Sequence, residues 1–198
     1  VWTIIFQPGG TDITTGKVVE TTMSSISTKA AAISSGSAIL NITPISTILT
    51  NIVQATGGTI TPTSITSSTT KLATTFGISA ESITSDYISE ANSNTAKLVH
   101  QIDVLVNTLS SAINDPIVNK DTIMSSLANT IVNTTENITI NLSNSNNITT
   151  IIAQVSTDNI SVTIDSTVNT NSVSFISNVN TILSNIDTAT KSFNNVFT

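Results

Sequence analysis

One pair of residues in this chain has the types and spacing needed for nucleophilic catalysis. His100 is the only imidazole in the sequence, and Asp103 follows it three residues later. On a helix, the Asp103 carboxylate would lie beside the imidazole and orient it, so that one of the many hydroxyl groups could act as the nucleophile of a hydrolase. The alternative is that Lys97, His100 and Asp103 form the solvated side of an amphipathic helix. We favour that alternative and predict no catalytic residues.

Two further groups of oxygen-bearing side chains have the types that bind metal ions. Carboxylates that could serve acid-base chemistry or bind calcium occur at Glu81, Asp86 and Glu90. Their spacing does not fix a shared site, and acidic residues are expected near a helix N-terminus in any case. A run that resembles a calcium loop, but lacks the glycine and terminal glutamate of an EF-hand, occurs at Asp165, Asn169 and Asn171. We therefore predict no metal site and no cofactor.

The composition excludes several classes of function. The absence of Cys excludes disulfides, thiolate nucleophiles and Cys-ligated metal sites. There is no Arg, and the 6 Lys residues lie far apart, so no basic patch is available to bind a nucleic acid. No apolar run approaches the roughly twenty residues of a membrane-spanning helix.

The surface is expected to consist mainly of uncharged polar groups. The chain of 198 residues contains 37 Thr, 29 Ser and 22 Asn, against 6 basic and 12 acidic residues. A surface with so little charge is insensitive to salt, which favours a location outside the cell. The first residue is Val1, which favours a segment excised from a longer precursor.

Acceptor triplets for N-glycosylation, Asn-x-Ser/Thr, are frequent in this sequence. Because a third of the residues are Ser or Thr, 22 Asn residues would give about seven triplets by chance, so their number does not by itself indicate glycosylation. One triplet begins at Asn41. The others cluster further along the chain, and we name them as candidate glycosylation sites: Asn133, Asn137, Asn141, Asn147 and Asn159.

The predicted fold is mainly α, a helical bundle with a small N-terminal β region. The β-branched and aromatic residues 1–6 predict a strand, which a turn at Pro8, Gly9 and Gly10 ends. Residues 17–22 and 37–42 are the expected pairing partners of this strand. We predict a strand and turn region over residues 1–42 and a helical domain over residues 43–198, together forming one structural unit.

The sequence marks several helix boundaries. Thr43-Pro44 and Thr61-Pro62 each place a capping hydroxyl before a proline at the first helical position. Gly57-Gly58 and Gly77 supply the stops. The apolar residues that fall on one face are Ile45, Ile48, Leu49, Ile52 and Val53 in the first helix, and Ile65, Leu72, Ala73 and Phe76 in the second.

Further along, apolar residues recur every three to four positions over residues 94–113, and Asp121 is expected to cap the next helix. Residues 138–142 and 160–164 alternate with period two, which predicts strands or extended linkers. The helical periodicity conflicts with the many β-branched residues, which favour strands; we side with periodicity because burial overrides intrinsic propensity. A last segment repeats the helical spacing at Phe175, Ile176, Val179, Ile182, Leu183 and Ile186.

Two motifs resemble a module of very large bacterial surface proteins and adhesins. Residues 9–16 read Gly-Gly-Thr-Asp-Ile-Thr-Thr-Gly and residues 43–49 read Thr-Pro-Ile-Ser-Thr-Ile-Leu, in the order and at the gap of that module's GGTDxxTG and TPLTTL patterns. Residues 71–78 and 85–112 are similar to its following helices. The chain departs from the module at Ile45, which replaces a Leu, and at residues 86–88, where Asp-Tyr-Ile replaces Asp-Pro-Ile. The resemblance implies a mostly helical, non-catalytic module outside the cell, with a structural turn around Asp12.

These observations predict a structural or adhesive subunit or module of an extracellular filament, stalk or giant surface adhesin. It would act by assembly and spacing, with neighbouring domains or identical subunits as partners and without nucleic acid or a membrane span. Because the first strand is too apolar to remain an exposed edge, we expect it to pair with a neighbouring sheet through Val1, Trp2, Ile4, Ile5 and Phe6. The alternatives are a virus or phage fibre, located on the virion surface, and a hydrolase that uses His100.

Overall fold

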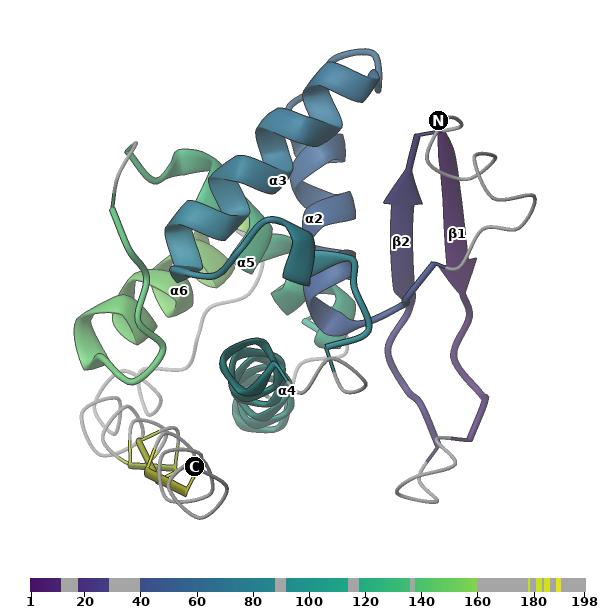
Figure 1. The fold of residues 1–198 in the computed structure, drawn as a ribbon. Coiled ribbons are helices and arrows are strands. Elements are labelled where there is room, and N and C mark those ends of the chain that lie inside the picture. The colour runs from purple at the N-terminus through teal and green to yellow at the C-terminus, as the bar shows by residue number, and fades with distance from the viewer. Residues whose placement is uncertain are drawn as a thin grey trace.

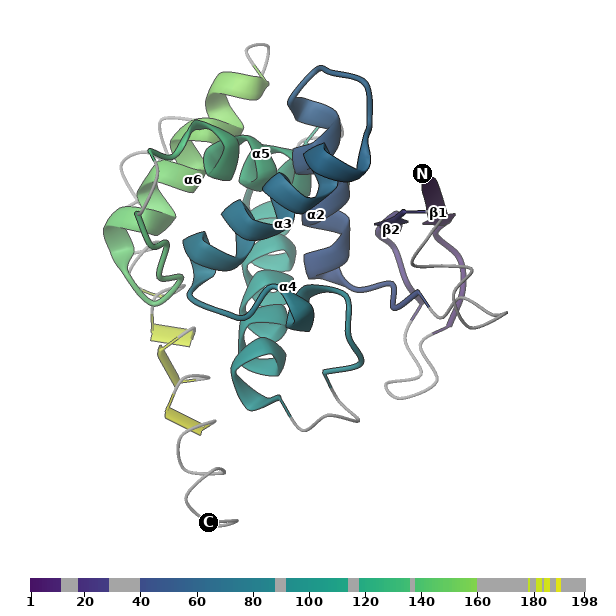
Figure 2. The same cartoon turned by 45° about the horizontal axis from the view of Figure 1, so that its top comes forward.

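The computed structural model describes residues 1–11, 18–28, 40–87, 92–113, 118–135 and 138–159, and a few single positions between 178 and 189. Within these ranges, five α-helices and one 3-10 turn follow a two-stranded antiparallel sheet. Figures 1 and 2 show the sheet at one side of the helical body, with strand β2 between strand β1 and helix α2. The prediction of a mainly helical fold with a small N-terminal β region is confirmed.

Helices α2 (Pro44–Ala55) and α3 (Pro62–Phe76) begin at the predicted caps. The Thr61 hydroxyl accepts a hydrogen bond from the Ser64 N–H at 3.1 Å, and the Ser64 hydroxyl accepts one from the Thr61 N–H at 2.9 Å. The same reciprocal capping box is present at the start of α2. Gly77 ends α3 in the left-handed region, with φ 65. Both predicted starts and the Gly77 stop are thus confirmed.

The cap of α3 provides a test of this local chemistry. We expect Thr61→Ala to lower the free energy of unfolding by about 1 kcal/mol, because the Ser64 N–H loses its acceptor. Urea denaturation measures this change. Thr66→Ala is the matched control, since Thr66 is exposed in the same helix and, among the described residues, its hydroxyl bonds only the Pro62 carbonyl. An equal loss of stability in the two variants would contradict the capping role.

Helix α4 (Ser93–Ile113) confirms the clearest periodicity of the sequence. Helix α5 (Lys120–Asn133) follows, but the predicted cap is wrong. Asn119 caps α5 by accepting a hydrogen bond from the Thr122 N–H at 3.0 Å. Asp121 lies in the first helical turn, where its carboxylate accepts a hydrogen bond from the Thr22 N–H instead. A 3-10 turn, η1 (Glu81–Ile83), lies between α3 and α4.

Helix α6 (Ser145–Asp158) is an element that the prediction did not include. Its signal is present in the sequence, because Ile148, Ile151 and Val155 are buried at helical spacing and Asn144 caps the helix. Before α6, residues 138–142 form an extended linker rather than a strand, and the Ile140 N–H donates to the Thr75 carbonyl at 2.7 Å.

The predictions for residues 160–164 and for the last apolar segment fall largely outside the described residues. Of that segment's predicted apolar face, Ile182 is described and is exposed.

Hydroxyl groups inside the helices explain how a sequence so rich in Thr forms them. Thr108 donates its hydroxyl hydrogen to the Val104 carbonyl at 2.7 Å, and Thr130 donates to the Ser126 carbonyl at 2.9 Å. The same contact, four residues back, recurs in α2, α3 and α6. The hydroxyls are thereby satisfied within their own helix, which leaves the aliphatic side chains free to pack.

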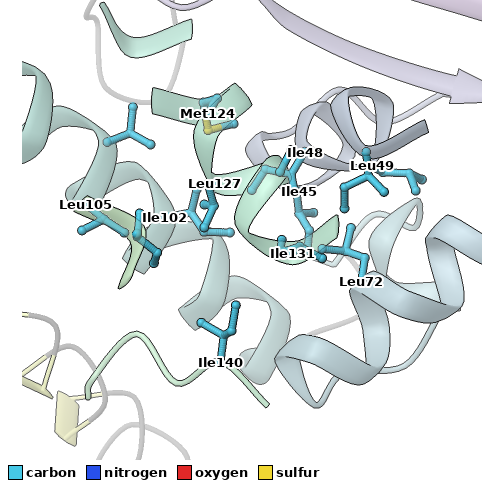
Figure 3. Close-up of a cluster of buried hydrophobic side chains, with 14 of the residues drawn as sticks. Ile45, Ile48, Leu49, Leu72, Ile102, Leu105, Met124, Leu127, Ile131 and Ile140 are labelled. Carbon is cyan, nitrogen blue, oxygen red and sulfur yellow. The ribbon is translucent and has the colours of Figure 1, made fainter. Parts of the chain in front are cut away.

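Helix α5 is the centre of the hydrophobic core, because it contacts α2, α3, α4 and α6. Figure 3 shows side chains of α2 and α5 meeting at this centre, with α3 and α4 around them. The apolar face predicted for α2 is buried. The faces predicted for α3 and α4 are buried except at Phe76 and Ile113, which are only partly buried against the core. Fully buried residues include Ile45, Ile48, Leu72, Ile102, Leu105, Leu127 and Ile131.

Strand β1 (Trp2–Phe6) confirms the predicted N-terminal strand, but its predicted partners are wrong. It pairs with β2 (Met23–Ser27), in a register that places Ile4 opposite Ser25. Of the predicted partners, residues 18–22 lie in the loop side of the hairpin, where Thr11 and Val18 form an isolated bridge, and residues 40–42 form no strand. Residues 17 and 37–39 lie outside the described residues. Sequence preference missed β2 because three of its five residues are Ser, which has no strong preference for strands.

Candidate functional site

The most unusual surface of the described chain is strand β1, which is apolar and exposed along its whole length. Trp2 retains 46% of its accessible surface, Ile4 42% and Ile5 53%. Val1 and Phe6 are exposed to a similar degree. Of the five residues that we predicted for an assembly strand, four therefore lie together on β1, and Val1 directly precedes it; all five are exposed.

The register of the sheet divides the side chains of β1 between two faces. Thr3 and Ile5 lie opposite Ile26 and Ser24, on the face that lines a cavity of ≈ 210 Å³ toward α2 and α5. Trp2, Ile4 and Phe6 lie on the other face, since successive side chains of a strand alternate. Both faces of β1 are exposed, so the strand projects beyond the helices that cover β2.

Two hydroxyl groups of α2 hold the backbone of β2. The Ser24 N–H donates to the Thr47 hydroxyl oxygen at 2.9 Å. The Ser46 hydroxyl donates to the Ser24 carbonyl at 2.8 Å. All three residues are buried. The edge of β2 that faces away from β1 is thereby closed by the first turn of α2.

This closure determines which backbone groups of β1 face outward. In an antiparallel pair, residues whose N–H and C=O point at the partner alternate with residues whose groups point away. The N–H and C=O groups of Ser24 point to α2 and away from β1. The N–H and C=O groups of Ile5, directly opposite, therefore point away from β2. Thr3, two residues earlier, has the same orientation. The N–H and C=O groups of Thr3 and Ile5 thus form the outer edge of the sheet.

Two contacts with the start of α5 fix the hairpin further. The Thr22 N–H donates to the Asp121 Oδ1 at 2.9 Å, and the Lys120 Nζ lies 2.6 Å from the Glu20 Oε2. The hydrogen bond from Lys120 and its positive charge hold the pKa of Glu20 below its usual value. This ion pair is exposed, so we expect its contribution to stability to be small and to weaken with salt.

The structure places the residues considered for catalysis on the outer surface of α4. His100 and Asp103 are both exposed, and the Asn107 side-chain amide donates to the Asp103 Oδ1 at 3.0 Å. Lys97 and Asn107 are half-buried on the same polar side. The arrangement matches the polar side of an amphipathic helix that the sequence favoured.

The residues considered for metal binding are not brought into a described site. Within the described ranges, no group of three or more His, Asp or Glu side chains has the geometry to hold a metal ion. Glu81 and Asp86 are exposed near η1, while Glu90, and also Asp165, Asn169 and Asn171, lie outside the described residues. Asp12, in the turn of the resemblance, lies outside them too.

The Asn residues of the acceptor triplets, which are Asn41 and the five candidate glycosylation sites, differ in how their side chains are used. Three amides donate to main-chain carbonyls and help to hold the fold: Asn41 to Thr84, Asn147 to Asn141, and Asn159 to Val155. Asn141 accepts a hydrogen bond from the Ser143 N–H, and Asn137 lies outside the described residues. Asn133 is exposed in the last turn of α5, so it is the candidate whose modification would disturb the described contacts least.

Tyr87, within the departure from the Asp-Pro-Ile motif, allows a pH test. Burial and the negative charge of Asp86 raise the pKa of Tyr87 above its ordinary value of 10.0. The neutral phenol is therefore favoured in the folded state, and its contribution to stability is present below pH 10.0 and is lost as the pH rises through the folded-state pKa. Because the chain has one Tyr, the phenolate absorbance reports this group directly.

We expect the native protein to titrate Tyr87 at higher pH than the urea-unfolded protein. Asp86→Asn should move the native titration partly back toward the unfolded one, since the smaller cause of the shift is removed. Coincident native and unfolded titration curves would show that Tyr87 is solvated.

Comparison with protein-family models, curated proteins and solved structures finds no match to this chain. The resemblance to modules of large surface proteins therefore stays a prediction from the motifs. No helix in the described ranges is long and apolar enough to cross a membrane.

Sequence reasoning did not identify Ser46 and Thr47 as the residues that fasten the sheet. Their only sequence signal is their position in the first turn after the Thr43-Pro44 helix start, where a hydroxyl is already explained by capping. Their contacts with the backbone of Ser24 depend on where β2 lies. The Ser-rich sequence of β2 did not predict a strand.

Proposed function

We propose that this chain is a non-catalytic structural or adhesive module of an extracellular filament, stalk or giant surface adhesin. The observation that carries the proposal is β1, an uncharged apolar strand that is exposed on a body otherwise rich in hydroxyl and amide groups. Large exposed apolar patches on soluble domains mark interaction surfaces. A strand with an open edge is suited to joining one module to another by main-chain hydrogen bonds.

The surface chemistry supports the same function. With 18 ionisable Lys, Asp and Glu residues in 198, the chain has little capacity for charge steering of ligands or for salt-dependent contacts. A surface of hydroxyls and amides stays hydrated at any ionic strength. These properties suit a spacer or scaffold that works outside the cell.

Immunogold electron microscopy of the intact source material tests the proposed location and class. Antibodies against the folded chain should label fibres, stalks or the outer surface without permeabilisation. Label that appears only after permeabilisation would contradict an extracellular role. Label on virus particles in place of cells would select the alternative, a virus or phage fibre protein.

A deletion tests whether β1 is the assembling element. Removing residues 1–6 should abolish or shorten the assemblies seen by electron microscopy. Assemblies of unchanged form and number would show that another surface joins the modules.

A further inference from the structure

We infer that the outer edge of β1, which no other described strand covers, pairs with β1 of a second copy of this chain. The two strands are antiparallel, with the two-fold axis at Ile4. The resulting four-stranded sheet has the order β2-β1-β1-β2. The inference rests on the proposed function, because it assumes that β1 is the strand used for assembly. It adds the identity of the partner and the register of the contact.

The orientation of the backbone restricts the registers that are available. Within β1 (Trp2–Phe6), Thr3 and Ile5 are the residues whose N–H and C=O groups point outward and can form the new main-chain hydrogen bonds. With the axis at Ile4, Thr3 of each copy lies opposite Ile5 of the other. Both members of each bonded pair are then outward-pointing residues, as the ladder requires. This register also uses all five residues of β1.

The side chains of β1 are complementary to themselves in this register. Trp2 of one copy lies opposite Phe6 of the other, and the two Ile4 side chains face each other. Direct neighbours in an antiparallel sheet share a face, so Trp2, Ile4 and Phe6 of the two copies form one continuous apolar patch. Cross-strand aromatic and β-branched pairs of this kind are favourable.

Charge favours a second copy over an unrelated partner. The first charged side chain in the sequence is Asp12, so β1 presents no side-chain charge. It also lacks the Lys, Pro or bulge by which edge strands normally resist pairing. A charged side chain on a partner strand would lose its hydration against Trp2 and Ile4, which costs free energy. A second β1 brings only uncharged side chains and avoids this cost.

The size of this contact sets its strength. Two paired five-residue strands bury less than the roughly 1,200 Å² of a stable protein interface. The dimer of the isolated chain should therefore be weak and depend on concentration. In an array of tethered copies the same contact becomes effective, because the local concentration is high.

A single cysteine tests the register, since the natural chain contains none. In the inferred dimer the two Ile4 Cα atoms lie about 4.5 Å apart, within the range of a disulfide. Under mild oxidation Ile4→Cys should form a disulfide dimer at least about tenfold faster than Thr3→Cys, whose two copies would lie more than about 7 Å apart. Mixing Thr3→Cys with Ile5→Cys should restore cross-linking, because these positions are direct neighbours.

A second variant tests the role of the backbone edge. Ile5→Pro removes an outward N–H and leaves the hydrogen bonds between β1 and β2 in place, so we expect a folded monomer. Ile5→Lys places a charge on the same edge and should have the same effect. Sedimentation velocity from about 10 µM to about 1 mM measures dimerisation, which either substitution should weaken at least about tenfold. Circular dichroism checks that both variants remain folded.

Two results would overturn the inference. One is a natural chain that stays monomeric at about 1 mM, with Ile4→Cys and Thr3→Cys cross-linking equally slowly. The other is a dimer that Ile5→Pro and Ile5→Lys leave unchanged, which would place the contact on another surface. In either case, immunogold label on the outer surface of the source material would still support the proposed extracellular function. Label only inside cells would contradict that function, whatever the result of the dimerisation experiments.

Discussion

Replacing Leu127 with Ala is expected to lower the free energy of unfolding by about 3 kcal/mol. Leu127 is completely buried on α5, the helix that contacts four others. Figure 3 shows it within the buried cluster that also contains Ile45 and Ile48 of α2 and Ile102 of α4. Truncation removes apolar contacts and leaves a cavity that rigid neighbouring helices cannot fill. Urea denaturation followed by circular dichroism measures the change.

A matched control separates burial from the chemistry of the substitution. Ile138 is 51% exposed in the linker before α6, so Ile138→Ala should change the free energy of unfolding by less than about 0.5 kcal/mol. Leu127→Met, which keeps most of the volume, should cost less than Leu127→Ala. A loss below about 1 kcal/mol for Leu127→Ala would show that the centre of the bundle is loosely packed.

The helical part of the fold was predictable because its signals are local. Thr-Pro starts, a Gly stop and apolar spacing placed α2, α3 and α4 without any tertiary information. Composition pointed to strands, but several Thr hydroxyls inside the fold, such as those of Thr50 and Thr130, are satisfied by a carbonyl of their own helix. Periodicity was therefore the better guide. The same spacing would have identified α6, had Asn144 been recognised as its cap.

The remaining elements depend on contacts that no local pattern contains. Asp121 has the right type for a helix cap, yet Asn119 takes that position, and the Asp121 carboxylate bonds Thr22 across the fold. Strand β2 forms from a Ser-rich segment because β1 pairs with one of its edges and α2 hydroxyls bind the other. Such positions are determined by partners far away in sequence.

The candidate site, too, was only partly predictable from the sequence. The strand β1 and its apolar character were evident from residues 1–6 alone. Which of its backbone groups face outward was not, because this follows from the hydrogen bonds that the backbone of Ser24 makes to Ser46 and Thr47 of α2. The register of any contact made by β1 is therefore set by α2, an element that need not touch the partner.

Thr47→Val is expected to lower the free energy of unfolding by about 2 kcal/mol. Valine keeps the shape of Thr47 but removes the oxygen that accepts the hydrogen bond from the buried Ser24 N–H. The buried Ser24 N–H would then have no acceptor from α2. A buried donor without a partner costs more free energy than removing both partners of a hydrogen bond. Thr108→Val is the matched control, because the Thr108 hydroxyl bonds only a carbonyl of its own helix in the described contacts and should be replaceable at less than about 0.5 kcal/mol.

Hydrogen exchange shows where the stability of Thr47→Val is lost. If α2 fastens β2, amide exchange should accelerate first in residues 23–27, and the fluorescence of Trp2, the only Trp, should change at lower urea concentrations than the helical signal. The sheet would then open before the bundle unfolds. Equal effects of Thr47→Val and Thr108→Val, with β2 still protected, would mean that pairing with β1 and burial of Ile26 hold the strand without these hydroxyls.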